Sequence, residues 1–153
     1  VEWDEHEHGE EYAARRKQLT DKSGAEKLGA SIYEVPPGKA AWPRHYHLVN
    51  EEAIFVQSGQ GLLHCGRNKL EIKEGDWVSL PAGKKHVHKL VNHGDEPLRY
   101  LCVSTMEEPE VVKYPDSDKV GVFAGSAPGG DKEKRTYHAY HKEEDGRDYW
   151  EDE

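Results

Sequence analysis

The sequence predicts an all-β protein, built as an antiparallel sandwich or barrel of short strands. Three observations carry this prediction. Short apolar runs recur between residues 28 and 104, turn-forming residues separate them, and no stretch with helical periodicity lies between them. Strands at this spacing are typical of antiparallel sandwiches and barrels. With 153 residues, the chain is expected to form a single domain over residues 1–153.

A turn signal follows nearly every expected strand. In chain order, the strands are expected at 28–35, 51–57, 62–64, 70–73, 77–80, 86–91 and 98–104. The segments between several of them are rich in Gly, Pro, Asn and Asp, which favour turns, at 36–38, 58–61, 65–68, 74–76, 81–83 and 92–97. The third of these segments is expected to be a hairpin turn. Together the strands form a barrel core over residues 28–104.

Two arms flank this expected core. The N-terminal arm, residues 1–27, is polar, and we expect a short helix at residues 10–19. The C-terminal arm, residues 105–153, is expected to be loop-like because of its breakers Pro109, Pro115, Pro128, Gly129 and Gly130. It also holds more aromatic side chains than a solvated tail usually does, including Phe123, Tyr137, Tyr140, Tyr149 and Trp150. We therefore expect this arm to pack on the barrel or on a partner subunit and to cover a sheet edge.

The net charge of −9 weighs against some classes of partner. Binding to nucleic acid through its phosphates needs a basic surface, so no nucleic-acid partner is expected. The acidity belongs to the termini, because residues 1–12 and 142–153 together carry −11 and residues 13–141 carry +2. No apolar run approaches the ~20 residues of a membrane span, so no membrane partner is expected.

The cysteine content and the N-terminal residues both favour a cytoplasmic protein. Cys65 and Cys102 are too few for a disulfide framework and form no C-x-x-C pair, so reduced thiols are expected. The chain begins with an acidic stretch, whereas a secretory signal begins with basic residues and continues with apolar ones.

Ten histidines are the most informative feature of the composition. His45 and His47 are separated by one residue, so on a strand both side chains leave the same face. Glu52 follows at the start of the next expected strand and shares a face with Ile54 and Val56. Two imidazoles and a carboxylate arranged in this way suit a divalent transition metal and leave coordination positions open for water or substrate.

The spacing of these residues resembles the two sequence motifs of the cupin superfamily. The first motif is matched, with one residue more than usual after the first glycine, by Gly38, His45, His47, Glu52 and Gly59. The second is matched by Gly75, Pro81, Gly83, a histidine and Asn92. The resemblance implies a jelly-roll barrel, also called a double-stranded β-helix, that binds one metal ion. Since cupins are commonly dimers, it also implies a homodimer.

The histidine of the second motif is either His86 or His88. Counting forward from Gly83 selects His86, and counting back from Asn92 selects His88, because two extra residues lie between these landmarks. We place the extra residues in the loop, which makes His88 the ligand and leaves His86 near the rim. The implied ligand set is then His45, His47, Glu52 and His88, with His86 as the alternative to His88. Four ionisable groups inside an apolar barrel would be costly to bury without an ion to bind.

Other candidate residues have plainer expected roles. Four histidines near the chain ends are expected to be solvated, namely His6, His8, His138 and His141. Tyr33 and Trp42 are expected to pack rather than to form a platform for substrate. Cys102 is expected to fill space as a small apolar side chain.

The expected metal is iron, manganese, nickel or zinc, since imidazole and carboxylate ligands suit all four. A metal with open positions can polarise a carbonyl, bind an enediolate or activate oxygen. The sequence therefore favours a metal-dependent enzyme that acts on a small polar molecule as a dioxygenase, an isomerase or a lyase. His86, where it is not a ligand, is a candidate acid or base because imidazole titrates near neutral pH. The alternative is a cupin that binds or senses a small molecule or a metal without turnover.

Overall fold

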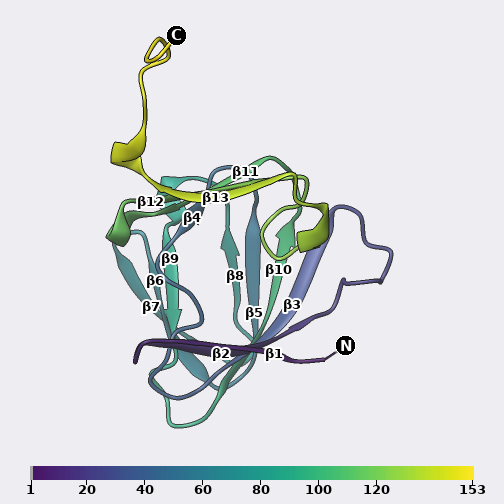
Figure 1. Ribbon diagram of the computed structural model, residues 1–153. Coiled ribbons are helices and arrows are strands. Elements are labelled where there is room, and N and C mark those ends of the chain that lie inside the picture. Colours follow the sequence, from purple (N-terminus) through teal and green to yellow (C-terminus); the bar gives the residue numbers. More distant parts are fainter. Residues whose placement is uncertain (1) are drawn as a thin grey trace.

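The computed structural model describes residues 2–153, and strands make up most of its regular structure (Figure 1). The strands of this described part are β1 (Asp4–His8), β2 (Tyr12–Gln18), β3 (Leu28–Val35), β4 (Tyr46–His47), β5 (Glu52–Ser58), β6 (Gln60–Cys65), β7 (Asn68–Lys73), β8 (Trp77–Leu80), β9 (His88–Val91), β10 (Leu98–Thr105), β11 (Glu110–Tyr114), β12 (Lys119–Ala124) and β13 (Tyr137–Lys142). Single turns of 3-10 helix occur at η1 (Lys84–His86), η2 (Pro115–Ser117), η3 (Lys132–Lys134) and η4 (Glu143–Asp145). The prediction of an all-β protein is confirmed.

The strands of residues 2–153 form three sheets with antiparallel pairing. The largest has the order β1-β2-β3-β10-β5-β8, the second β13-β12-β11-β4, and the third β7-β6-β9. Strands far apart in the chain are neighbours, as β3 and β10 are, which is the crossover pattern of a jelly roll rather than of a simple meander. Side chains of the first and third sheets share one apolar core, for example Val35, Val56, Leu63, Leu90 and Leu98. This core fills the interior of the barrel.

Strand β5 shows how alternation along the sequence orients the site. It lies between β10 and β8 in the largest sheet. Ile54 and Val56 are 5% and 0% exposed, whereas Phe55 between them is 37% exposed. Because successive side chains of a strand point to opposite faces, Glu52 lies on the same face as Ile54 and Val56, toward the barrel interior.

The N-terminal arm contradicts the prediction of a short helix at residues 10–19. Most of that segment is β2, which pairs with β1 on one side and with β3 on the other. Its alanines, arginines and lysine favour a helix locally, but an isolated helix of about ten residues is marginal in water. Two ladders of interstrand hydrogen bonds, together with the burial of Ala13 and Ala14, outweigh that preference. The arm therefore extends the largest sheet.

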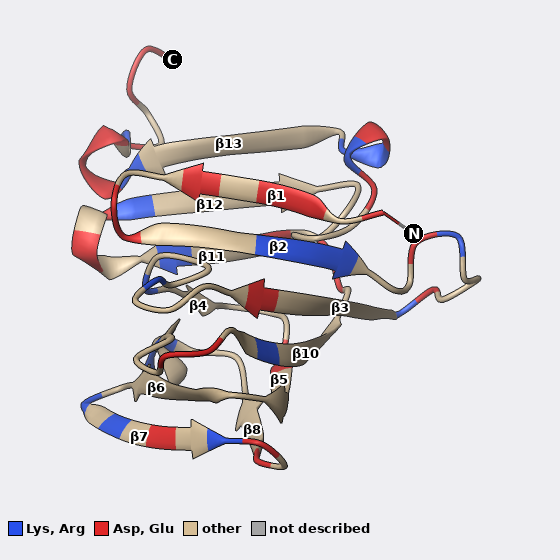
Figure 2. Cartoon of the chain, turned by 90° about the horizontal axis from the view of Figure 1, so that it is seen from below, with Lys and Arg blue, Asp and Glu red and all other residues tan. Residues whose placement is uncertain are grey.

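Opposite charges face one another across the first two strands. Figure 2 shows acidic residues on β1 and basic residues on β2 beside it. Asp4 lies opposite Arg16, and Glu5 lies opposite Arg15. The ion pair of Arg15 is formed with Glu34 of β3, so the arginine ties the arm to the largest sheet.

The C-terminal arm contradicts the expectation of a loop-like segment. β11, β12 and β13 form a meander, and β11 pairs with β4. Val112 and Phe123 are only 2% and 3% exposed. Pro115 belongs to the turn between β11 and β12, so the turn residues connect strands rather than replacing them. Beyond η4 the chain extends away from the barrel (Figure 1), and Tyr149 and Trp150 are 82% and 73% exposed, so these two do not pack on it.

Two smaller expectations can be compared with the structure. Cys65 and Cys102 are both free thiols, as expected. Within residues 2–153, none of the helices has the length and apolar character needed to cross a membrane.

A core substitution should test the packing described above. Leu98 is fully buried opposite Val35, so Leu98→Ala should lower the free energy of unfolding by about 2–5 kcal/mol. Leu28, in β3 and 57% exposed, provides the control, because Leu28→Ala should stay within about 0.5 kcal/mol of the wild type. Denaturant unfolding followed by circular dichroism measures both. Equal losses in the two variants would contradict the placement of Leu98 in the core.

Candidate metal centre

Four side chains from four places in the chain meet inside the barrel. His45 lies just before β4, His47 is in β4, Glu52 begins β5 and His88 begins β9. Backbone hydrogen bonds link His45 and His88 in both directions, at 3.0 and 2.9 Å. Strand register, rather than any helix or loop, therefore brings these residues together.

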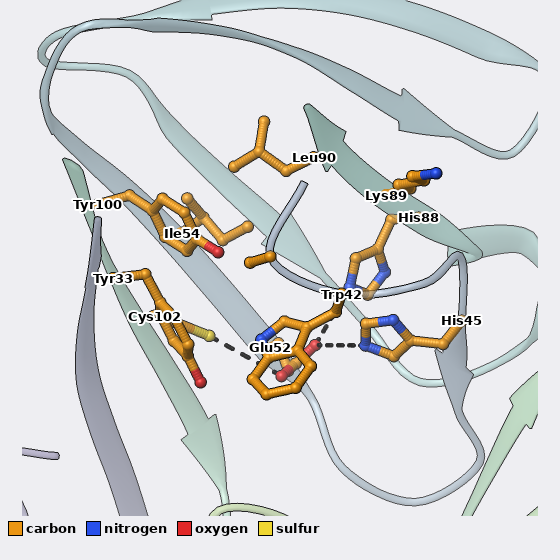
Figure 3. Close-up of a pocket in the computed structure, with 11 residues that line it drawn as sticks. Tyr33, Trp42, His45, Glu52, Ile54, His88, Lys89, Leu90, Tyr100 and Cys102 are labelled. Atoms are coloured by element: carbon orange, nitrogen blue, oxygen red, sulfur yellow. Dashed lines mark hydrogen bonds and ion pairs between the residues drawn. The ribbon is translucent and has the colours of Figure 1, made fainter. Parts of the chain in front are cut away.

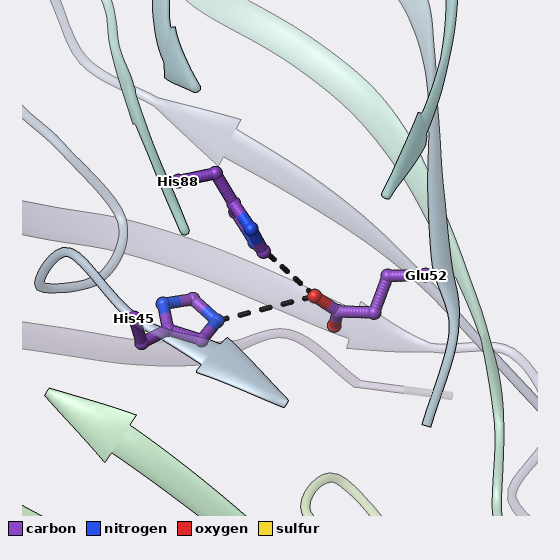
Figure 4. Close-up of side chains that lie close together, drawn as sticks. All are labelled: His45, Glu52 and His88. Carbon is purple, nitrogen blue, oxygen red and sulfur yellow. Dashed lines mark ion pairs between the residues drawn. The ribbon is translucent and has the colours of Figure 1, made fainter. Parts of the chain in front are cut away.

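The imidazoles converge on a single oxygen of Glu52. The Nε2 atoms of His47 and His88 each lie 3.2 Å from Glu52 Oε2, and the Nε2 atom of His45 lies 3.9 Å from it. Figure 4 shows His45 and His88 directed at this oxygen from two sides. Potential ligand atoms of His45, Glu52 and His88 lie within 4.8 Å of one another. His47 is not part of this group of mutually close atoms and joins the cluster through its contact with Glu52.

Each imidazole is held through its other ring nitrogen. The Nδ1 atom of His45 lies 2.8 Å from the carbonyl oxygen of Pro43, and that of His88 lies 2.8 Å from the carbonyl oxygen of His86. The Nδ1 atom of His47 lies 3.3 Å from Oε2 of Glu110. The acceptors at these positions orient each Nδ1 as a donor, which turns the Nε2 atom of each ring toward the barrel interior.

Burial and charge act differently on the individual groups. Burial, followed by the neighbouring His88, lowers the pKa of His45 to about 3, so this imidazole is neutral at physiological pH. Burial also opposes a proton on His47, but Glu110 and Glu52 outweigh it and raise its pKa to about 9. Burial alone would raise the pKa of Glu52, yet the adjacent imidazoles of His47 and His88 hold it well below its ordinary value. Glu52 is therefore ionised.

These residues fit a divalent transition metal. Within residues 2–153, the Nε2 atom of His47 is among the few buried side-chain polar atoms that have no hydrogen-bond partner. An ion beside Glu52 would satisfy this atom. Three imidazoles and one carboxylate form a donor set that suits such an ion, and four protein ligands leave positions free for small molecules. An ion would also compensate the charge of Glu52.

The extra residues of the second motif lie outside the strand. Lys84 to His86 form the 3-10 turn η1, and β9 begins at His88. The imidazole of His88 therefore faces Glu52, whereas His86 contributes its backbone carbonyl to orient His88. His86 is partly exposed and is not among the residues that line the cavity at Glu52.

A cavity of about 50 Å³ lies beside the cluster (Figure 3). Besides His45, Glu52 and His88, its wall includes aromatic and apolar side chains and one thiol, among them Tyr33, Trp42, Ile54, Leu90, Tyr100 and Cys102. Its volume suits about one or two water-sized groups. Only the reacting end of a substrate can therefore enter it in this conformation.

Cys102 was expected only to fill space, and the structure gives it a polar neighbour. Its Sγ atom lies 3.8 Å from Glu52 Oε1. Burial, followed by the charge of Glu52, raises the pKa of this thiol well above its ordinary value. Cys102 is therefore protonated and acts as a weak donor to the carboxylate rather than as a nucleophile.

Trp42 packs against other rings, as expected, whereas His6 differs from its expected role. Trp42 is 41% exposed and lines the cavity. The imidazole of His6 stacks on its indole, with ring centroids 4.2 Å apart, and the Nε2 atom of His6 lies 2.8 Å from the carbonyl oxygen of Ala41. His6 is thus not merely solvated, because the N-terminal arm uses it to hold Trp42 at the cavity.

Glu110 is the residue of this region that the sequence analysis missed. Its side chain is 0% exposed, yet it is a carboxylate. The only local signal is an acidic residue at an inward position of an apolar strand, Glu110 to Val112. That pattern could not reveal its partner, His47, 63 residues away in the chain.

The chain matches a family model and a protein of known sequence. Residues 31–104 match the family model of the cupin domain. An uncharacterized protein of Methanocaldococcus jannaschii is 38% identical over 60 residues, which are 39% of this chain and 46% of that protein. The chain therefore spans less than half the length of this curated relative.

Two solved structures resemble the chain over most of its length. A candidate sugar phosphate isomerase from Acidithiobacillus ferrooxidans is 27% identical with a TM-score of 0.74, covering 88% of this chain and 80% of that one. A sugar phosphate isomerase of the cupin superfamily from Silicibacter pomeroyi is 26% identical with a TM-score of 0.72, covering 86% and 77%.

The raised pKa of His47 predicts a pH dependence for protein freed of metal by a chelator. The pKa of His47 is about 9 in the folded chain, against an ordinary value of 6.5. The stabilisation of the folded state that comes from the proton on His47 is therefore complete below pH 6.5. It should be lost as the pH rises from 6.5 to about 9, and this difference corresponds to about 3 kcal/mol. Urea unfolding across this range measures the loss.

In His47→Gln the free energy of unfolding should no longer fall over this pH range, because the substitution removes the titrating group. His93→Gln changes an exposed histidine and should leave the slope of the wild type unchanged. If the free energy of unfolding of the wild type stays constant between pH 6.5 and 9, His47 gains no proton on folding.

Proposed function

The chain belongs to the cupin superfamily, and from this premise we propose that it is a metal-dependent enzyme that isomerises a sugar phosphate. The metal is held by His45, His47, Glu52 and His88. The observation that carries the proposal is the convergence of three imidazole Nε2 atoms on one carboxylate oxygen. Iron, manganese, nickel and zinc all suit this set.

Support for the isomerase class comes from the two structures that match this chain over more than four fifths of its length. Isomerisation of an aldose to a ketose by proton transfer needs a base that takes a proton from one carbon and returns it to the adjacent one. The ionised carboxylate of Glu52 in the cavity wall can do this. A bound divalent metal stabilises the negative charge that develops on the oxygens of those carbons. The cavity beside Glu52 suits a group of this size, with the rest of the substrate extending past Trp42.

Side chains of the cavity wall donate hydrogen bonds to the reacting group and exclude water from it. Burial raises the pKa of the Tyr33 hydroxyl, so Tyr33 keeps its proton and can donate to a substrate oxygen. Cys102 also remains protonated. Ile54 and Leu90 contribute apolar surface that excludes water, and a low local dielectric strengthens each polar contact with the substrate. The reactive end is thus met by donors and apolar surface.

Elemental analysis should test the ligand set. Reloaded wild-type protein should hold about one divalent transition metal ion per chain, and the double variant His45→Ala, His47→Ala should hold almost none. His88→Ala should lose most of the metal because its Nε2 atom faces Glu52, whereas His86→Ala should keep it. The reverse order for the last two variants would make His86 the ligand. A wild type without metal after reloading would refute the proposed function.

An isomerase assay should test the reaction. Metal-loaded protein incubated in D2O with a panel of aldose and ketose phosphates should interconvert one pair and incorporate deuterium at the carbon that loses its proton. The double variant His45→Ala, His47→Ala should be inactive, and His93→Ala, which changes an exposed residue, should match the wild type. Oxygen uptake serves as the counter-assay. Uptake without isomerisation would assign an oxygenase, and metal binding without any turnover would favour the alternative of a binding or sensing cupin.

A further inference from the structure

The carboxylate of Glu110 is an unusual group to bury. It lies in β11 with 0% exposure, on the same inward face as Val112. Val112 pairs directly with His47 of β4, so Glu110 lies diagonally across from the proposed ligand. A charge in this position is stable only if hydrogen bonds replace the water it has lost.

The two oxygens of Glu110 accept a full set of hydrogen bonds. Oε1 accepts from the backbone N–H of Val49 at 3.1 Å and from that of Val111 at 2.9 Å. Oε2 accepts from the backbone N–H of Asn50 at 2.9 Å, from the side chain of Asn50, and from Nδ1 of His47 at 3.3 Å. These five donors replace the water that the buried carboxylate has lost.

Asn50 prevents this carboxylate from rotating. Its Nδ2 atom also donates to the carbonyl oxygen of Glu107 at 2.9 Å. Its Oδ1 atom accepts from the Thr105 hydroxyl at 2.9 Å and from the backbone N–H of Glu107 at 2.7 Å. Every polar atom of the Asn50 side chain is therefore engaged, and the network is rigid. It joins the end of β10 to the corner between the two proposed ligands His47 and Glu52.

The histidines differ in what holds them. His45 and His88 are held by backbone carbonyl oxygens, which are neutral, whereas His47 is held by a carboxylate. A carboxylate on Nδ1 fixes the ring orientation and the tautomer, and it makes the Nε2 atom a stronger donor to a metal. The Nε2 atom of His47 is buried and has no hydrogen-bond partner among residues 2–153.

We infer that Glu110 is a positioning residue of the metal centre, acting through His47 to hold its Nε2 atom at the ion. The inference rests on the metal site of the proposed function and goes beyond it. It gives the C-terminal meander a direct part in metal binding, since β11 supplies this carboxylate. It also assigns the corner at residues 48–50 a role in setting the distance between His47 and Glu52.

Glu110→Gln tests this role, because it keeps the shape of the side chain and removes its charge. Glu107→Gln is the matched control, since it makes the same change on an exposed side chain three residues earlier. Zn²⁺ affinity is measured by competition with a chelating dye, at a temperature where circular dichroism shows each protein folded. Glu110→Gln should bind Zn²⁺ about 10- to 100-fold more weakly, and Glu107→Gln should match the wild type.

A second measurement on the wild type separates positioning from a structural role. In Zn²⁺-loaded protein labelled with ¹⁵N, the His47 ring should show a protonated Nδ1 protected from exchange with water and a metal-bound Nε2. A metal on Nδ1, or an Nδ1–H that exchanges freely, would overturn the inference even if Glu110→Gln fails to fold. Unchanged Zn²⁺ affinity in folded Glu110→Gln would also overturn it. Both results leave the proposed function intact, whereas a wild type that binds no Zn²⁺ refutes the proposed function and this inference with it.

Discussion

Glu52 carries a negative charge into a barrel whose neighbouring positions are Ile54 and Val56, and an isolated carboxylate in such surroundings is strongly destabilised. The imidazoles of His45, His47 and His88 surround its Oε2 atom. β4, β5 and β9 belong to three different sheets, so closing the barrel is what assembles the cluster. A metal ion would complete the compensation of charge that the protein groups begin.

Both arms of the chain act on this cluster rather than only covering sheet edges. The N-terminal arm stacks His6 on Trp42 at the cavity. It is also tied to β9 by an ion pair between Lys89 and Glu11. The C-terminal meander places Glu110 behind His47. The N-terminal arm therefore contacts the wall of the cavity, and the C-terminal meander contacts the Nδ1 atom of His47.

The cavity restricts which chemistry the centre can support. A volume of about 50 Å³, bordered by apolar side chains, protonated Tyr33 and Cys102 and the ionised Glu52, accepts a small polar group and offers it both donors and a carboxylate. Larger parts of a substrate must lie beyond Trp42, which is already partly exposed. Movement of the N-terminal hairpin would therefore change access to the site without changing the ligands.

Local patterns in the sequence were sufficient for the all-β class and for the inward direction of Glu52, because both depend on the two-residue period of strands. The resemblance to the cupin motifs added His88 to the set, and the structure brings His45, Glu52 and His88 together. The extra residues before His88 could likewise be assigned to a turn, η1. By contrast, the segment at 10–19 looked helical because local propensity cannot show the two strands that pair with it.

Only the tertiary structure decided the roles of Glu110, His6 and Trp42. Each depends on a partner distant in the chain, as with Glu110 and His47, and no spacing rule connects such residues. The C-terminal strands were hidden for the same reason, since their pairing with β4 is non-local. The sequence by itself therefore determined the class of fold and the chemistry of the candidate ligands. The tertiary structure decided how those ligands are oriented and enclosed, because orientation comes from hydrogen bonds and stacking contacts that form only when the barrel closes.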